Sequence, residues 1–152
     1  MFVSKLLMEA LPNIHLIGML TMSCTVVFRK KALVPVYIFV LLNGIYAGFD
    51  VWWLPYLYIW AVLWGVTMLL PQNMPENVKC IVYPAVCALH GLLFGTLYAP
   101  VWALVMRLDF SQMLAWIVAG FPMDLIHAAG NFVTGLLIVP VSSLLARLMK
   151  KL

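Results

Sequence analysis

The feature that most constrains this chain is a succession of apolar runs, each ended by proline, glycine, asparagine or a cluster of charges. Hydrophobic residues make up 66% of the sequence and charged residues only 9%, whereas a soluble domain averages about 25% charged residues. The mean hydropathy of +1.08 agrees with this composition. These runs predict an integral membrane protein, and a length of 152 residues favours one domain over residues 1–152.

The apolar runs are expected to be helices, because lipid cannot satisfy the backbone groups at an open sheet edge. Five runs cover residues 2–11, 14–28, 33–48, 52–70 and 78–98, and a sixth begins at 121 and ends in the basic stretch 147–151. Between the last two runs, residues 99–120 contain Pro100, Arg107 and Asp109, which predict a broken segment. The predicted fold class is an all-α membrane protein with six transmembrane helices in one bundle.

Basic residues set the expected orientation in the membrane. Six helices that alternate from a cytoplasmic N-terminus place seven of the nine basic residues on one side: Arg29, Lys30, Lys31, Lys79, Arg147, Lys150 and Lys151. The positive-inside rule makes that side cytoplasmic, so both termini are predicted there. Aromatic residues within 52–60 then lie at the outer end of the fourth run, where interfacial belts form. The few basic residues cluster at helix ends and do not indicate a nucleic-acid partner.

The first run is too short to cross a membrane. At ~1.5 Å per residue, the ten residues 2–11 reach only about 15 Å, half of a ~30 Å hydrocarbon core. We expect a start site placed too late, which would truncate this helix; the alternative is a half-span packed against its neighbours. Lys5 and Glu9 interrupt the run and no small-residue cleavage site follows, so no cleavable signal peptide is predicted.

Four polar residues share one face of the last run. Asp124, His127, Asn131 and Thr134 fall within about 80° of one another at ~100° per residue. A charged group inside a membrane costs roughly 2.5–3.5 kcal/mol, so such groups face a cavity, a partner or a ligand. We interpret the stripe as a functional site. Asp124 has an alternative reading as a cap of this helix, because Pro122 precedes it in the predicted first turn.

Other polar and aromatic residues map to the outer half of the predicted bundle and suggest a small-molecule cavity. Trp53 and Tyr56 have an alternative reading as interfacial anchors, and His90, beside Gly91, as a helix–helix hydrogen bond. The predicted substrate-binding residues are Asn13, His15, Asp50, Trp53, Tyr56, His90, Asp124, His127 and Asn131.

Metal and catalytic chemistry have weaker signals. Asp124 and His127 stand three apart and could share a cation with His15 or Asp50, yet no second histidine follows at i+4 and no cysteine pair has ligand spacing. The three cysteines lie in apolar runs and read as small buried hydrophobes. No nucleophile stands beside a base and no glycine-rich phosphate loop is present, so we expect neither an enzyme nor a bound cofactor or metal.

Three segments carry a resemblance to a known family. They are Gly-Phe-Pro-Met-Asp124-Leu-Ile-His127-Ala-Ala-Gly-Asn131-Phe in the last run, Leu-Pro12-Asn13-Ile-His15-Leu-Ile-Gly, and Gly-Phe-Asp50-Val-Trp-Trp53-Leu-Pro-Tyr56. With six short helices and an outer polar cavity, the chain resembles the substrate-binding S components of energy-coupling factor (ECF) transporters over nearly its whole length.

This resemblance implies capture of a vitamin or related micronutrient on the outer side of a prokaryotic plasma membrane. In the family, the loop between helices one and two, here residues 12–15, closes over the ligand, and residues 50–53 and the outer parts of the last helices line the pocket. The S component docks onto a transmembrane coupling subunit with two cytoplasmic ATPases and topples to release its cargo. The small-residue docking motif of the family's first helix is missing from residues 2–11.

Two other functions stay open at this stage. A small structural or scaffolding protein, of the MreD-like cell-shape type, would use the stripe to satisfy partner helices, and a metal-ion carrier ranks third. For a capture protein, the aromatic residues suit a planar heterocycle, and Asp124 would favour a cationic or donor-rich edge. Thiamine-like, pyridine-like and pterin- or deazaguanine-like compounds all meet this description.

Overall fold

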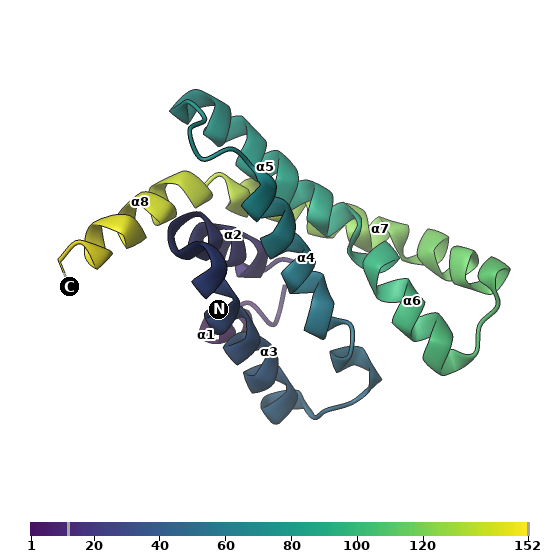
Figure 1. The fold of residues 1–152 in the computed structure, drawn as a ribbon. Helices are drawn as coiled ribbons and strands as arrows, with labels where there is room; N and C mark the ends of the chain where they lie inside the picture. The colour runs from purple at the N-terminus through teal and green to yellow at the C-terminus, as the bar shows by residue number, and fades with distance from the viewer. Residues whose placement is uncertain (12, 152) are drawn as a thin grey trace.

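A computed structural model describes residues 1–11 and 13–151 of the chain, and within them every regular element is helical (Figure 1). Pro12, which we predicted in the loop that closes over a ligand, lies outside the described residues. The elements are α1 (Phe2–Leu7), α2 (Ile17–Phe28), η1 (Arg29–Ala32), α3 (Leu33–Ala47), η2 (Val51–Trp53), α4 (Tyr56–Leu69), α5 (Glu76–Leu92), α6 (Phe94–Met106), α7 (Phe110–Gly135) and α8 (Ile138–Met149).

Among the described residues, three stretches are long and apolar enough to cross a membrane: Val51–Leu69, Glu76–Met106 and Phe110–Gly135. The prediction of an all-α membrane protein is thus confirmed at this level. Large apolar side chains also cover the outside of the described chain, among them Leu69 (84% exposed) and Leu104 (80% exposed). Such a surface suits contact with lipid rather than water.

The predicted break over residues 99–120 is confirmed only at residues 107–109, and its predicted length is wrong, because the rest of this segment is helical. α6 continues through Pro100 to Met106, the chain turns at Arg107 in the left-handed region (φ 54°), and α7 begins at Phe110. The start of α7 is a capping box: Gln112 N donates to Asp109 Oδ1 (2.8 Å) and Asp109 N donates to Gln112 Oε1 (2.9 Å). The two charged residues thus mark a tight turn between helices.

The last predicted run is also divided differently. α7 extends from Phe110 to Gly135 with Pro122 in its interior, and a separate helix, α8, follows after two residues. Figure 1 shows α8 turning away from the line of α7 toward the C-terminus. The predicted last helix is therefore two helices, and its polar stripe lies in the second half of α7.

α5 and α7 pack along each other, and this crossing leaves no room for side chains (Figure 1). A Cβ on Gly91 would lie 2.9 Å from the carbonyl oxygen of His127 and 3.0 Å from the amide nitrogen of Ala128. The close approach of the two backbones brings the polar stripe of α7 against α5. α2 lies beside both helices and also contacts α4 and α8.

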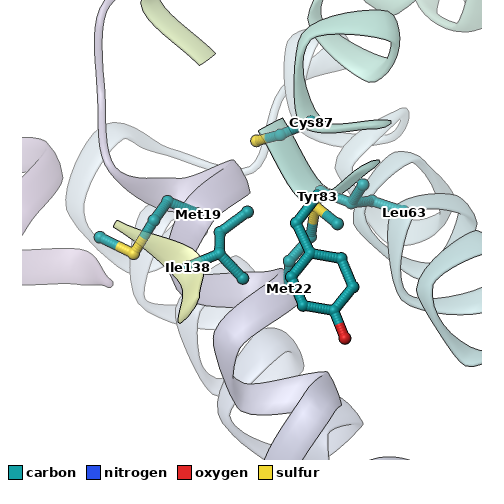
Figure 2. Close-up of a cluster of buried hydrophobic side chains, with 6 residues drawn as sticks. All are labelled: Met19, Met22, Leu63, Tyr83, Cys87 and Ile138. Atoms are coloured by element: carbon teal, nitrogen blue, oxygen red, sulfur yellow. The ribbon is translucent and has the colours of Figure 1, made fainter. Parts of the chain in front are cut away.

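Two apolar clusters hold the bundle together. Figure 2 shows the first, in which side chains from α2, α4, α5 and α8 meet: Met19, Met22, Leu63, Tyr83, Cys87 and Ile138. The second joins α2, α3 and α4 through Ile17, Val36, Phe39, Val40 and Trp60. Tyr56 and Phe94 pack against the second cluster, which therefore forms the floor beneath the candidate site. All three cysteines are free thiols, and Cys87 is buried in the first cluster.

Candidate functional site

A pocket of about 190 Å³ lies where α1 and the segment after it meet the first turns of α4 and α6 and the middle of α7. Its walls are Lys5, Met8, Glu9, Leu11, Asn13, Ile14, His15, Tyr56, Phe94 and His127. A larger groove, of about 470 Å³, lies at the other end of α2, beside the first turns of α5 and α8. That groove contains none of the predicted binding residues, so we take the smaller pocket as the candidate site.

All three histidines of the chain gather beside this pocket, around Trp60 and Phe94. The ring centroids of His15 and His127 are 4.9 Å apart, and those of His127 and Phe94 are 4.8 Å apart. Trp60 is fully buried in the second cluster, and its ring centroid lies 5.9 Å from that of His15 and 5.6 Å from that of His90. The spacing of positions 15, 90 and 127 in the sequence does not indicate that the three histidines lie close together, and only the fold brings them together.

Each of the three histidines has a buried ring nitrogen without a partner within the described chain, and two of the three, His15 and His127, line the pocket. His15 Nδ1 and His127 Nε2 are buried and make no hydrogen bond within the described chain, and both residues line the pocket. A buried polar atom without a partner lowers the stability of a protein by about 1–3 kcal/mol. A ligand that forms hydrogen bonds with these two nitrogens would remove that cost and would therefore bind more tightly. Burial, with a smaller contribution from the charge of nearby Lys5, lowers the pKa of His15 to about 4, so this ring is neutral at neutral pH.

Lys5 is a pocket residue that the sequence interpretation missed. Its Nζ donates to Asn43 Oδ1 at 2.6 Å, and it lies 5.7 Å from the ring centroids of both Trp52 and Tyr56. In the sequence, this lysine reads only as an interruption of an apolar run. The signal was nevertheless present, because a charge inside such a run needs a partner.

Four of the nine predicted binding residues line the pocket: Asn13, His15, Tyr56 and His127. Asn13 has φ 58°, and its Nδ2 donates to the carbonyl of Met123 on α7 at 3.3 Å. This long hydrogen bond ties the segment between α1 and α2 to the opposite wall. Tyr56 is at the first turn of α4. Its ring packs edge-to-face against that of Phe94, with the two ring centroids 6.3 Å apart.

Asp124 is engaged elsewhere. Its Oδ1 accepts a hydrogen bond from Gly95 N at 3.0 Å, near the start of α6, and only 6% of the residue is exposed. Asp124 lies well inside α7, whose N-cap is Asp109, so the reading of Asp124 as a cap of its own helix is wrong. The carboxylate instead caps the neighbouring helix α6, where it meets the positive end of the helix dipole.

Asn131 and His90 connect helices. Asn131 Nδ2 donates to the carbonyl of Cys87 at 3.1 Å, joining α7 to α5. His90 Nε2 lies 3.1 Å from the carbonyl oxygen of Ile59, joining α5 to α4, as the helix–helix reading of this residue anticipated. His90 lines a different, apolar pocket of about 120 Å³ between α4 and α5.

Asp50 and Trp53 lie outside the pocket. The exposed Asp50 accepts a hydrogen bond from Val51 N at 2.6 Å and so caps the short helix η2. Trp53 Nε1 donates to the carbonyl of Val40 at 2.8 Å, which fastens η2 to α3. Both residues hold the chain around the site, and their predicted contact with a ligand stays a prediction.

Within the described residues, no three His, Cys, Asp or Glu side chains gather closely enough to hold a metal ion. The pocket therefore offers an ammonium, two imidazole nitrogens and aromatic walls. This set can bind a small ring compound by stacking, hydrogen bonds and charge. A comparison of the chain with protein-family models, curated proteins and solved structures finds no match.

Proposed function

We propose that this chain is the substrate-capture (S) subunit of an ECF-type importer and binds a vitamin or related micronutrient in the pocket beside His15 and His127. The single observation that carries the proposal is the meeting of Lys5, His15 and His127 on one pocket with aromatic walls. Polar atoms without partners at the end of an apolar bundle are expensive, and a ligand that pairs with them explains their presence.

The size of the pocket supports a small cargo. About 190 Å³ corresponds to roughly six waters at ~30 Å³ each, and lies below the ~300–1,000 Å³ of common drug-sized sites. One or two rings fit this space better than a large cofactor. Tyr56 and Phe94 supply flat walls on which such a ring can stack.

The proposal extends to topology and partners. The pocket lies at the end of α2 opposite Arg29, Lys30 and Lys31, and the positive-inside rule makes that basic end cytoplasmic. The pocket then opens to the outside of a prokaryotic plasma membrane, and six crossings leave both termini inside. A transmembrane coupling subunit and two cytoplasmic ATPases would supply the energy for release of the cargo.

Equilibrium binding tests the proposal directly. The protein, purified in detergent, is titrated with a panel of vitamins and related ring compounds by isothermal calorimetry, and freshly purified protein is examined by native mass spectrometry. We expect at least one compound to bind at micromolar concentration or tighter, with Ser143→Ala in the distant groove as a control that retains binding. A panel in which nothing binds better than millimolar would contradict the proposal.

One observation favours the structural alternative of the MreD-like type. Three of the four stripe residues are paired inside the chain: Asp124 with Gly95, Asn131 with Cys87, and Thr134 Oγ1 with the carbonyl of Gly130 (2.9 Å). These pairs need no ligand, and Asn131 Oδ1 is the atom among these three side chains that stays without a partner within the described chain. Affinity purification from native membranes separates the two functions, because co-purification with cell-wall synthesis proteins in place of ATPase subunits would favour the scaffold.

A further inference from the structure

We infer that the compound bound in the pocket is a small planar ring carrying one carboxylate, and that Lys5 is its counter-ion. This inference rests on the proposed function, because it names the chemistry of the compound that the subunit captures. It is carried by the surroundings of Lys5, by the engagement of Asp124 outside the pocket, and by the unpaired nitrogens of the two pocket histidines.

The ammonium of Lys5 is a half-buried cation whose acidic neighbour, the exposed Glu9, forms no ion pair with it. Its hydrogen-bond partner is the amide oxygen of Asn43, which is neutral, and no ion pair to Lys5 occurs within the described residues. The faces of Trp52 and Tyr56 stabilise the charge in part through cation–π contacts. A buried charge is normally paired, and a carboxylate in the pocket would complete this environment.

Lys5 also keeps the capacity to bind a ligand. An ammonium has three N–H donors, and Asn43 takes one of them. Asn43 is itself held in place, because its Nδ2 donates to the carbonyl of Phe39 at 2.7 Å. The lysine head is therefore positioned before a ligand arrives, which reduces the ordering that binding would require.

The acidic residues do not oppose this preference. Asp124, on which we based the expectation of a cationic ligand, caps α6 and does not line the pocket. Glu9 lines the pocket but is exposed, so water screens its charge. The charge that faces the pocket from a less solvated position is that of Lys5, and an anion is the better match.

The remaining walls indicate a ring with a second polar group. His127 Nε2 and His15 Nδ1 are the unpaired atoms, while Phe94 and Tyr56 form aromatic walls. A single ammonium matches a monoanion, whereas a phosphomonoester carries about two negative charges near neutral pH. An aromatic or heteroaromatic carboxylate thus fits the pocket better than a phosphate ester.

The test uses probes that share one shape and differ in charge. Benzoate, benzamide and benzamidine are titrated into the purified full-length protein at pH 7.5, together with pyridine-3-carboxylate and pyridine-3-carboxamide. We expect the acid of at least one series to bind ten-fold or more tightly than its amide, and the amidine to bind more weakly still. Lys5→Met should abolish this preference, whereas the conservative Lys5→Arg and the control Ser143→Ala, in the distant groove, should retain it.

The results test the carboxylate inference and the capture function separately. An amide or amidine that binds as tightly as its acid, or an acid preference that survives Lys5→Met, overturns the carboxylate inference and leaves the capture function standing. Failure of these probes and of the vitamin panel to bind better than millimolar overturns both. The ratio of acid to amide affinity in the unsubstituted protein needs no variant, so poor folding of Lys5→Met would not prevent the decision.

Discussion

The carboxylate of Asp124 on α7 accepts the backbone N–H of Gly95 at 3.0 Å and thereby caps α6. The hydrogen bond lies just after Leu93, where the long α5–α6 stretch is interrupted. Gly95 is needed there, because a Cβ at this position would clash with the carboxylate. An acid that the sequence suggests as a ligand contact therefore has a structural partner within the chain.

Gly95→Ala should destabilise the protein by about 1–3 kcal/mol, because the added methyl group displaces Asp124 and leaves a buried carboxylate without its donor. Gly120→Ala in the same helix as Asp124 is the matched control, since a Cβ there meets nothing within 4 Å. That control should be neutral or stabilising by up to ~1 kcal/mol from helix propensity. Thermal unfolding in detergent measures the stability of both variants. Equal unfolding midpoints for Gly95→Ala and Gly120→Ala would contradict the role of Asp124 as a cap.

Asn131→Ala should lower the free energy of unfolding by about 0.5–1.5 kcal/mol, because the hydrogen bond that joins α7 to the carbonyl of Cys87 on α5 is lost inside an apolar bundle. We expect little change in ligand affinity, since Asn131 does not line the pocket. Asn73→Ala, in an exposed turn, is the control for loss of an amide. A variant that unfolds like the control but binds ligand more weakly would place Asn131 in the site after all.

His127→Phe should weaken binding of the tightest compound in the panel by about ten-fold, or ~1.4 kcal/mol. The substitution keeps a ring between His15 and Phe94 and removes the unpaired Nε2. The ligand-free protein should be as stable as the wild type or more stable, because the substitution removes a buried nitrogen without a partner and no hydrogen bond of that atom is lost. Calorimetric titration beside Ser143→Ala measures the effect, and wild-type affinity in His127→Phe would remove this nitrogen from the site.

Acid should destabilise the protein through His15. Its pKa in the folded chain is about 4, lowered by burial from 6.5, so the unfolded chain takes up a proton first as the pH falls. The free energy of unfolding is therefore highest above pH 6.5 and decreases from there toward pH 4. His15→Gln should reduce this dependence, measured as unfolding midpoints at pH 7.5, 5.5 and 4.5. An unchanged slope in the variant would assign the effect to other groups.

The sequence indicated the helices well where their signals are local. The runs that became α3 and α4 begin and end within a few residues of prediction, because hydropathy and proline placement act within one segment. Residues 99–120 were misread for the same reason. Arg107 and Asp109 look like a polar break, and only the reciprocal bonds between Asp109 and Gln112 mark them as a turn and a cap.

The candidate site was predictable in part. Asn13, His15, Tyr56 and His127 were predicted from their residue types and positions, and they line one pocket. Lys5 was missed, because its partner Asn43 lies 38 positions away and no periodicity relates the two. The stripe on α7 was correctly placed on one face, yet its members divide: His127 lines the pocket, Asp124 caps α6 and Asn131 contacts α5.

By itself the sequence determined that this chain is helical and has runs apolar enough to cross a membrane, because burial in lipid depends on the local sum of hydropathy along each run. Only the tertiary structure decided which polar group is satisfied within the chain and which remains for a ligand. Asp124 and Gly95 are 29 positions apart, and Asn131 and Cys87 are 44 apart. Such pairs form where helices cross, and crossing points depend on how all the helices pack together.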